Sequence, residues 1–441
     1  MTSPLAPVAT EIEALLLEQT LPGLEEILPA GEFVMPNFQG LGIANLPATV
    51  AALLGGELPG ACPPLRRDLW ADWSDGLERV ILVVVDALGY RQLLAEMAAD
   101  EGLVFHRLSE AGRLVPLTTT FPSTTNTVLT TLWTGYSPAA HGILAFELYL
   151  RELGVAASTL FFWPIHHRQR DELGAWGLKA EEFCPVPGLA ERLVAQGIDV
   201  YSLVSKAYAH SMLSRIHRRG VCDTIGFVSG ADMWLQLQRL CRATRSASSS
   251  KRFLAAYWDT MDGITHRWGP EDASWGLELG GLSHMMRTAF LEQLTPAQRE
   301  GTLLLLTADH GGVQTPRQAA IRYEKHPRLR DALTLPPVGE SRVPFFYARP
   351  GSLEEVQAYL GGHLAEAFRV LTREQVLESG LLGPGPQAAE TPHRVGDLVG
   401  VARGAHYLAR DKTQLKMVGR HGGLSPTEML VPLLGVRLDA L

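Results

Sequence analysis

The residues Thr307-Ala308-Asp309-His310-Gly311 place a carboxylate and an imidazole side by side at the end of an apolar run. The run before them, GTLLLLT, is typical of a strand buried on both faces. A polar turn at the end of a strand would explain the pair. A metal site would explain it too, because carboxylate oxygens and imidazole nitrogens are both ligands of divalent cations. The rest of the chain has to decide between the two explanations.

Two further carboxylates follow other apolar runs. Asp86 ends the run RVILVVVD, and Asp262 follows LAAYWDTM. Functional groups in open α/β sheets collect beyond the carboxyl ends of the strands, so we expect Asp86, Asp262 and Asp309 to lie at one edge of a sheet. Three unpaired carboxylates would repel one another there unless they bound protons or cations. The arrangement therefore predicts a metal site.

Two histidines extend the candidate ligand set. His266 lies four residues after Asp262, so on a helix the two side chains would share one face and could hold one ion. His421 is followed by two glycines and precedes the last apolar run, in a loop that would allow its ring to point into a cleft. Alone, neither histidine would indicate a metal, because such spacings and turns are common.

A threonine-rich segment, VPLTTTFPSTTNTVLTTLWTGYSPAAHG (115–142), offers a candidate nucleophile. It lies between a predicted strand and a predicted helix, and Pro122 suits a first helical turn. A hydroxyl at the N-terminus of a helix, beside divalent cations, loses its proton readily and can attack phosphorus, while backbone N–H groups bind the phosphoryl oxygens. We predict Thr120, directly before Phe121-Pro122, for this role.

The elements that carry these residues alternate between strands and helices. Apolar runs predict strands within 79–86, 198–204, 252–258, 301–307, 342–350, 397–402 and 429–438, and helical spacing appears at 188–196 and 352–368. Such alternation is typical of an α/β fold with a mostly parallel central sheet flanked by helices.

The length of 441 residues fits two domains or one large α/β domain with insertions. Residues 1–76, rich in Leu, Pro, Gly and Glu, predict an N-terminal segment of helix and loop, and residues 77–441 the catalytic domain. Stretches that mix aromatic residues with His and Arg predict insertions over the active site at about 145–185 and 205–250, although ordinary helices and loops would have the same composition.

Composition excludes several classes of protein. A net charge of −8 and a pI near 6.0 argue against binding a nucleic acid polymer through a broad basic face. The four cysteines have no paired spacing, so neither structural zinc nor a disulfide framework is expected. No signal peptide or membrane-spanning run is readable, and we expect a cytoplasmic protein that does not enter a membrane. The oligomeric state stays open.

One other motif could suggest a nucleophile. Cys62-Pro63-Pro64-Leu65-Arg66 fits the loose pattern around the nucleophile of sulfatases. It lacks the usual serine, and it precedes the first core strand where a sulfatase has this motif after it. We therefore expect no sulfatase chemistry at Cys62.

Taken in order, six motifs resemble the nucleotide pyrophosphatase/phosphodiesterase branch of the alkaline phosphatase superfamily. They are the strand ending in Asp86, Thr-Phe-Pro, TGYSPAAHG, DGITHRWGP, ADHG and a late HGG. The resemblance spans roughly Val80 to Pro432. It implies an alkaline phosphatase-like core and a metal-dependent hydrolase that acts on a small phosphate ester or a nucleotide.

The resemblance also implies roles for individual residues. One zinc ion would be held by Asp262, His266 and His421. A second would be held by Asp86, Asp309 and His310, and it would also touch Thr120. Thr120 would be the nucleophile and carry a covalent intermediate. Manganese or cobalt would also suit these nitrogen and oxygen ligands.

Departures from the family pattern leave the substrate open. Where the diesterases have an asparagine shortly after the HGI element, this chain has Phe146 and Glu147, and Ser123 stands in place of the asparagine of Thr-Phe-Pro-Asn. A phosphodiesterase of the nucleotide pyrophosphatase type is our first expectation. The alternatives are a phosphomonoesterase or phosphonate hydrolase of the same superfamily and, from another class, a non-catalytic metal-dependent binding module.

Overall fold

The structure is a computed structural model that describes residues 6–242 and 251–441. The start of the N-terminal segment, 1–5, and the end of the second predicted insertion, 243–250, lie outside the described residues.

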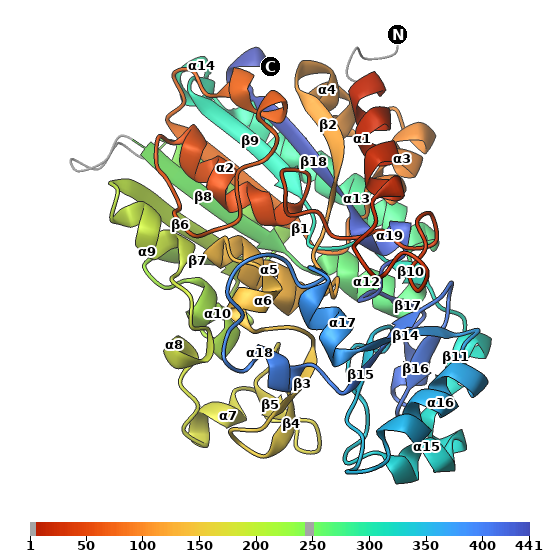
Figure 1. The fold of residues 1–441 in the computed structure, drawn as a ribbon. Coiled ribbons are helices and arrows are strands. Elements are labelled where there is room, and N and C mark those ends of the chain that lie inside the picture. The colour runs from red at the N-terminus through yellow and green to blue at the C-terminus, as the bar shows by residue number, and fades with distance from the viewer. Residues whose placement is uncertain (1–5, 243–250) are drawn as a thin grey trace.

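A mostly parallel sheet of seven strands forms the centre of the molecule (Figure 1). In spatial order its strands are β2 (Arg113–Thr118), β18 (Leu430–Arg437), β9 (Thr302–Thr307), β1 (Arg79–Val85), β8 (Lys251–Trp258), β6 (Ile198–Ser205) and β7 (Asp223–Phe227). The strand β18 runs antiparallel to both of its neighbours, whereas β1, β6, β7, β8 and β9 are parallel. The middle strands are buried along nearly their whole length, as expected of a sheet covered on both faces. The predicted fold class is confirmed.

Helices lie against both faces of this sheet. One group, whose members contact one another or the sheet, consists of α3 (Tyr90–Ala99), α4 (Val104–Ala111), α11 (Gly230–Arg242) and α13 (Ala273–Met285). Another group around α5 consists of α2 (Leu46–Leu53), α5 (Thr125–Thr134), α9 (Leu189–Val194) and α10 (Met212–His217). The helix α12 (Thr260–Trp268) follows β8 directly, at the edge of the sheet where β1 and β9 also end.

A second, antiparallel sheet lies beside this edge (Figure 1). Its strands in order are β14 (Phe368–Thr372), β15 (Leu398–Ala402), β13 (Pro344–Phe346), β12 (Val338–Gly339), β3 (Glu147–Leu150), β4 (Val155–Ser158) and β5 (Trp163–Pro164). The apolar runs at 342–350 and 397–402 thus form strands here and not in the central sheet. The helix predicted at 352–368 is α16 (Leu353–His363), which packs against β14.

The two predicted insertions differ in the structure. Residues 145–185 contribute β3, β4 and β5 to the second sheet, together with the short helices α7 (Glu172–Ala175) and α8 (Ala180–Phe183). The described part of 205–250 contributes α10 and α11, and also β7, the last strand of the central sheet. This second stretch therefore extends the core as well as covering it.

The described part of the N-terminal segment packs on the core. The helix α1 (Ala6–Glu18) contacts β2, and Gly42 pairs with Thr118 at the end of that strand. Side chains such as Leu28, Phe33 and Trp73 belong to the same buried apolar cluster as the central strands. No helix in the described ranges has the length and apolar character needed to cross a bilayer.

Candidate active site

Three neighbouring strands deliver the carboxylates to one place. Asp86 follows β1 directly, Asp309 lies two residues beyond the end of β9, and Asp262 lies in the first turn of α12 after β8. Because β8, β1 and β9 are adjacent and parallel, their carboxyl ends meet at one edge of the sheet. All three carboxylates therefore lie together at one edge of the sheet, as the positions of the strand ends in the sequence predict.

The histidines contact these carboxylates. The Nε2 atom of His310 lies 3.4 Å from Asp86 Oδ1 and 3.6 Å from Asp309 Oδ2. The Nε2 atoms of His266 and His421 lie 3.3 Å and 3.8 Å from the two oxygens of Asp262. The rings of His310 and His421 are stacked, with their centroids 3.7 Å apart. All six residues predicted as metal ligands thus form one cluster.

Backbone carbonyls fix the orientation of each imidazole in the cluster. The Nδ1 atoms of His266, His310 and His421 lie 2.9 Å from the carbonyl oxygens of Gly419, Gly311 and Ser123. A carbonyl oxygen can only accept, so each Nδ1 carries the proton and donates it. In the neutral form of each ring, the Nε2 atom then has its lone pair facing the carboxylates. This is the usual way in which a second contact prepares a histidine to bind a metal ion.

The protonation states of the cluster suit a cation. Burial lowers the pKa of His310 to about 4 and that of His421 to about 3, so both rings are neutral near pH 7. Burial and the neighbouring carboxylates Asp309 and Asp262 raise the pKa of Asp86 well above its usual value. Burial also raises the pKa of Asp309 to about 6, although the N–H of Ala87 lowers it. A divalent cation would relieve this crowding of buried negative charge.

Unpartnered oxygen atoms show where cations would fit. Asp86 Oδ1, Asp262 Oδ1 and Asp309 Oδ2 are buried and accept no hydrogen bond. Two groups of three residues have ligand atoms within 4.8 Å of one another: Asp262 with His266 and His421, and Asp86 with Asp262 and His310. The first group is the set expected for one ion. The second group contains Asp262 in place of Asp309, which the family resemblance implies as a ligand of the second ion. Asp262 belongs to both groups and therefore lies between the two candidate ion positions.

The helix after the threonine-rich loop begins later than the sequence predicts. The expected start near Pro122 is wrong: Thr124 is the N-cap, and Thr125 is the first residue of α5. The intervening chain is anchored to the loop that contains His421, since the Ser123 N–H donates to Gly422 O and the Ser123 hydroxyl donates to Gly423 O. These contacts keep the chain extended past Pro122.

The later helix start changes which threonine meets the cluster. The Oγ1 atom of Thr125 lies 3.2 Å from His310 Nε2, and Thr125 lines both cavities that open onto the cluster. The hydroxyl of Thr120 is buried without a hydrogen-bond partner, and Thr120 lines neither cavity. The structure therefore brings the Thr125 hydroxyl to the six predicted ligands, whereas no hydrogen bond joins the buried Thr120 hydroxyl to them.

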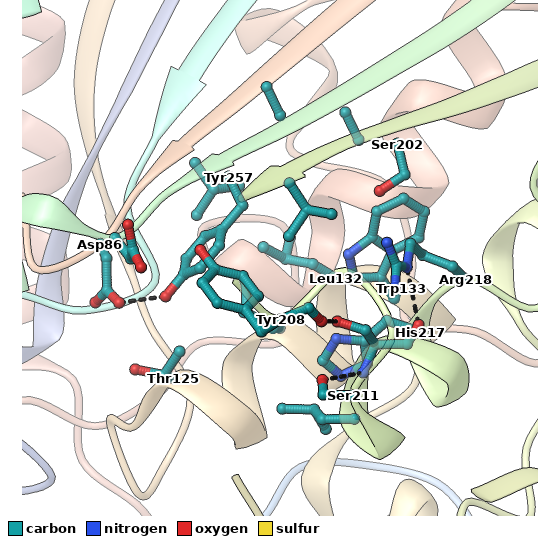
Figure 2. Close-up of a pocket in the computed structure, with 18 of the residues that line it drawn as sticks. Asp86, Thr125, Leu132, Trp133, Ser202, Tyr208, Ser211, His217, Arg218 and Tyr257 are labelled. Carbon is teal, nitrogen blue, oxygen red and sulfur yellow. Dashed lines mark hydrogen bonds between the residues drawn. The ribbon is translucent and has the colours of Figure 1, made fainter. Parts of the chain in front are cut away.

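Sequence reasoning also missed two residues around the cluster. The hydroxyl of Tyr257, near the end of β8, donates a hydrogen bond to Asp86 Oδ2 (Figure 2). Glu428 accepts hydrogen bonds from the N–H groups of Gly423 and Ser425, and so holds the loop after His421. For Thr125 the sequence contains a partial signal: the proline-free run that ends at Gly135 indicates a helix, but it begins at Ser123 and does not fix the first helical residue. Tyr257 and Glu428 have no comparable local signal.

Other residues noted in the sequence have structural surroundings. Cys62 is buried with Phe38 and Ala44, and burial raises the pKa of its thiol to about 12, which makes it a poor nucleophile. The Phe146 N–H donates to Glu340 Oε1, and Glu147 forms an ion pair with Arg410. These two residues occupy the place after the HGI element where the diesterase pattern has an asparagine.

Comparison with known proteins gives the class of this site and then the family. The fold and the cluster are those of a metal-dependent hydrolase of phosphoric esters. A family model for type I phosphodiesterase/nucleotide pyrophosphatase matches residues 80–424, and the chain belongs to that family. No curated protein matches the sequence significantly.

Solved structures share the fold at low sequence identity. Murine ectonucleotide pyrophosphatase/phosphodiesterase 5 is 20% identical with a TM-score of 0.63, over 81% of this chain and 87% of that chain. An inactive form of the murine protein, in which alanine replaces a threonine, was solved in complex with AMP; it is 18% identical with a TM-score of 0.63, over 81% of this chain and 88% of that chain. Phosphonoacetate hydrolase from Sinorhizobium meliloti, in complex with phosphonoformate, is 18% identical with a TM-score of 0.59. The match covers 82% of this chain and 94% of that chain.

Proposed function

We propose that this enzyme is a phosphodiesterase of small molecules that uses the Thr125 hydroxyl as its nucleophile and two zinc ions as cofactors. The observation that carries the proposal is the position of the Thr125 hydroxyl, 3.2 Å from His310 Nε2, within the cluster of carboxylates and imidazoles. The inactive threonine-to-alanine form of the murine relative supports a threonine in this role. The proposal replaces Thr120 by Thr125 as both nucleophile and metal contact.

The residues that would hold the ions are those whose free ligand atoms already face one another. Asp262, His266 and His421 would hold one ion, and Asp86 and His310 the other, with Asp262 or Asp309 completing its coordination. Bound there, the cations would supply a Lewis acid that lowers the pKa of the Thr125 hydroxyl and neutralises charge on the phosphoryl oxygens. Nitrogen and oxygen donors without thiolates suit zinc and also admit manganese or cobalt.

The chain itself orients the substrate and forms the covalent intermediate. As the first residue of α5, Thr125 lies where the N–H groups of the first turn lack intrahelical partners, so they can donate to phosphoryl oxygens. The bond from Thr125 Oγ1 to phosphorus forms while the bond from phosphorus to the leaving oxygen breaks, and the alcohol departs with the proton of the hydroxyl. A water molecule then attacks phosphorus, so the phosphoryl group leaves as a phosphomonoester that carries the water oxygen, and a proton of the water returns to Thr125 Oγ1.

The shape of the site favours a diester. One cavity of ≈ 350 Å³ and another of ≈ 480 Å³ are both lined by Thr125, Asp262 and Phe161. A diester has an organic group on each of two ester oxygens, whereas a monoester has only one. Two cavities that meet at the nucleophile can therefore each hold one group of a diester. All four cysteines are free, which fits a reducing compartment, and we retain the cytoplasm as the proposed location.

A second candidate, monoester or phosphonate hydrolysis, is favoured by the second cavity. Phe146 and Glu147, which stand where the diesterase pattern has an asparagine that helps hold the phosphoryl oxygen, line this cavity together with Thr124 and Thr125, so the phosphate pocket differs from that of the diesterases. Fold similarity to phosphonoacetate hydrolase is compatible with this candidate.

The test is a comparison of bis(4-nitrophenyl) phosphate with 4-nitrophenyl phosphate, using zinc-loaded wild type, Thr125→Ala and Thr120→Ala. We expect faster cleavage of the diester, a loss of turnover on the order of 10³-fold or more in Thr125→Ala, and near-wild-type rates in Thr120→Ala. Faster cleavage of the monoester would retain the nucleophile and move the enzyme to the second candidate. A loss of turnover in Thr120→Ala only would overturn the assignment of Thr125. Bound zinc with no turnover of either ester would favour a non-catalytic binding module.

A further inference from the structure

The ≈ 350 Å³ cavity extends from the cluster into the layer between the central sheet and the helices (Figure 2). Asp86 and Thr125 lie at one end of it. Arg218, Trp133 and Ser202 lie at the other end, with Tyr257 and Tyr208 between. This volume is that of about a dozen water molecules in the liquid, which is enough for a compact organic group. The inference drawn from this cavity rests on the proposed function, because it concerns the group attached to phosphorus.

The strand register explains why the space is hollow. Leu82, Ala255 and Ser202 are partners in register on β1, β8 and β6, so their side chains point to the same face of the sheet. Along this row the side chains become small at Ala255 and Ser202, which leaves unfilled a layer that is normally close-packed. All three residues line the cavity.

The helix α5 connects the cavity with the nucleophile. Thr125, Leu129 and Leu132 are spaced four and three residues apart, so they follow one face of α5, and all three line the cavity. A group bonded through oxygen to a phosphorus atom at Thr125 would therefore lie along Leu129 and Leu132. These side chains, with Leu82 and Phe253, make the middle of the cavity largely apolar.

A cation without a counter-ion lies at the far end. Arg218 lines the cavity, its Nε donates to Ser214 O at 3.0 Å, and its Nη1 is buried with no partner. Across residues 6–242 and 251–441, no carboxylate lies within ion-pair distance of Arg218. The neighbouring His217 is neutral, because burial and, to a smaller extent, the charge of Arg218 lower its pKa to about 3. Burial lowers the pKa of Arg218 only to about 10, so it stays charged at neutral pH.

We propose that this cavity binds the organic group of the substrate, and that this group is compact, largely apolar and anionic at the end remote from phosphorus, where it pairs with Arg218. The Arg218 side chain is partly buried, but its Nη1 atom is buried in the cavity wall without a partner, so an anionic group of the ligand can pair with it there. A carboxylate suits this position, because the planar guanidinium can bind it with two parallel hydrogen bonds.

The test measures binding to the zinc-loaded protein by calorimetry. The probes are benzylphosphonate and 4-carboxybenzylphosphonate, which differ only in the remote carboxylate. We expect wild type to bind the carboxylated ligand about tenfold more tightly or better, as a charge-assisted hydrogen bond in a partly buried site would give. Equal binding of the two ligands by wild type would overturn the proposal without any variant.

Three variants test whether Arg218 and the cavity cause the preference for the carboxylated ligand. Arg218→Met should remove the preference for the carboxylate while it leaves benzylphosphonate binding within about twofold. Arg215→Met, at an exposed arginine of α10 three residues before Arg218, is the matched control and should keep the preference. Ser202→Leu should fill the cavity and weaken both ligands about tenfold. A preference that persists in Arg218→Met, or that is lost in Arg215→Met, would refute the role of Arg218.

Turnover separates this inference from the proposed function. If the same preparation cleaves nitrophenyl esters but binds the two phosphonates equally, the hydrolase stands and the anionic substrate group is refuted. If it cleaves no ester and binds neither phosphonate, both are refuted.

Discussion

Buried histidines in this protein act as neutral hydrogen-bonding groups as well as candidate ligands. His141, in the TGYSPAAHG motif, accepts a hydrogen bond from the Ile143 N–H at its Nδ1. Its Nε2 must then carry the proton, which it donates to the hydroxyl of Thr131 in α5. This residue of the family pattern therefore ties the following loop to the helix that begins with Thr125.

The protonation of His141 gives a prediction about acid stability. Burial, and then the charge of Arg394, lower the pKa of His141 to about 3, whereas an unfolded histidine has its pKa near 6.5. Between these values only the unfolded state takes up the proton, so stability falls as pH decreases below 6.5. From pH 7 to pH 5 this histidine should lower the free energy of unfolding by about 2 kcal/mol.

Urea unfolding of wild type and His141→Asn at pH 7 and pH 5 measures this effect. The variant should be the less stable protein at pH 7, but the difference should shrink by about 2 kcal/mol at pH 5, because asparagine does not titrate. His284→Asn, at an exposed histidine, controls for the loss of an imidazole in general. A difference that does not change with pH would contradict a neutral buried His141.

Among the elements, the loop that carries His421 depends on a buried ion pair. Arg342, between β12 and β13, binds both oxygens of Glu428 in the short helix α19 (Pro426–Met429), at 2.7 and 2.8 Å, and both side chains are fully buried. Glu428 in turn binds the N–H groups of Gly423 and Ser425. The pair therefore links the second sheet to the loop of a candidate metal ligand.

Breaking this pair should affect stability and metal binding together. Arg342→Met leaves the charge of Glu428 buried without its partner, and it should lower the free energy of unfolding by about 3–5 kcal/mol. Zinc affinity should fall roughly tenfold or more, because residues that support ligands typically have effects of this size. Chemical unfolding and zinc titration measure the two effects. Arg349→Met, which also removes an arginine near the second sheet, should leave zinc affinity unchanged.

At this scale the sequence predicts some elements well and others poorly. The strands before Asp86, Asp262 and Asp309 are continuous apolar runs, and the rule that strand ends converge then places the carboxylates. The start of α5 could not be read in the same way, because contacts of Ser123 with Gly422 and Gly423, some 300 residues later, determine it. Strands such as β5 and β12, two residues long, are too short for any periodicity to reveal them.

At the scale of the whole molecule, favourable apolar packing and unfavourable repulsion between carboxylates meet at the edge of the central sheet. An apolar core that includes the strands is continuous with the N-terminal segment, and it encloses a cluster of carboxylates that repel one another. The fold therefore supports an arrangement that is unfavourable until a cation binds. This balance makes the stability of the whole chain depend on metal ions through mass action.

Removal of metal should lower thermal stability by an amount that depends on metal concentration. With zinc at about 100 times its dissociation constant, the folded state gains roughly 2.7 kcal/mol over the metal-free protein. We expect a chelator to lower the melting temperature and added zinc to restore it, as measured by scanning calorimetry. A melting temperature that is the same with chelator and with zinc would contradict the assignment of the cluster as a metal site.

Asp309→Asn should make the metal-free protein more stable and the zinc-bound protein less stable. Burial raises the pKa of Asp309 from 3.8 to about 6. At pH 7.5 the ionised carboxylate therefore destabilises the metal-free fold. This destabilisation is lost as the pH falls through 6 towards 3.8, because the folded protein then takes up the proton first. Asparagine keeps an oxygen to accept from the Ala87 and His310 N–H groups and has no charge. Without metal, the variant should be more stable than wild type at pH 7.5 by about 1–3 kcal/mol, and this advantage should shrink at pH 5.

With saturating zinc, the order should reverse, because the variant has lost a negative charge that stabilises bound cations. Melting temperatures of both proteins, with chelator and with zinc, measure the reversal. Asp259→Asn, on the same sheet edge but outside the cluster, should shift both states alike. If wild type were the more stable protein in both states, Asp309 would be a structural acceptor for the Ala87 and His310 N–H groups and not a charge held in place for a cation.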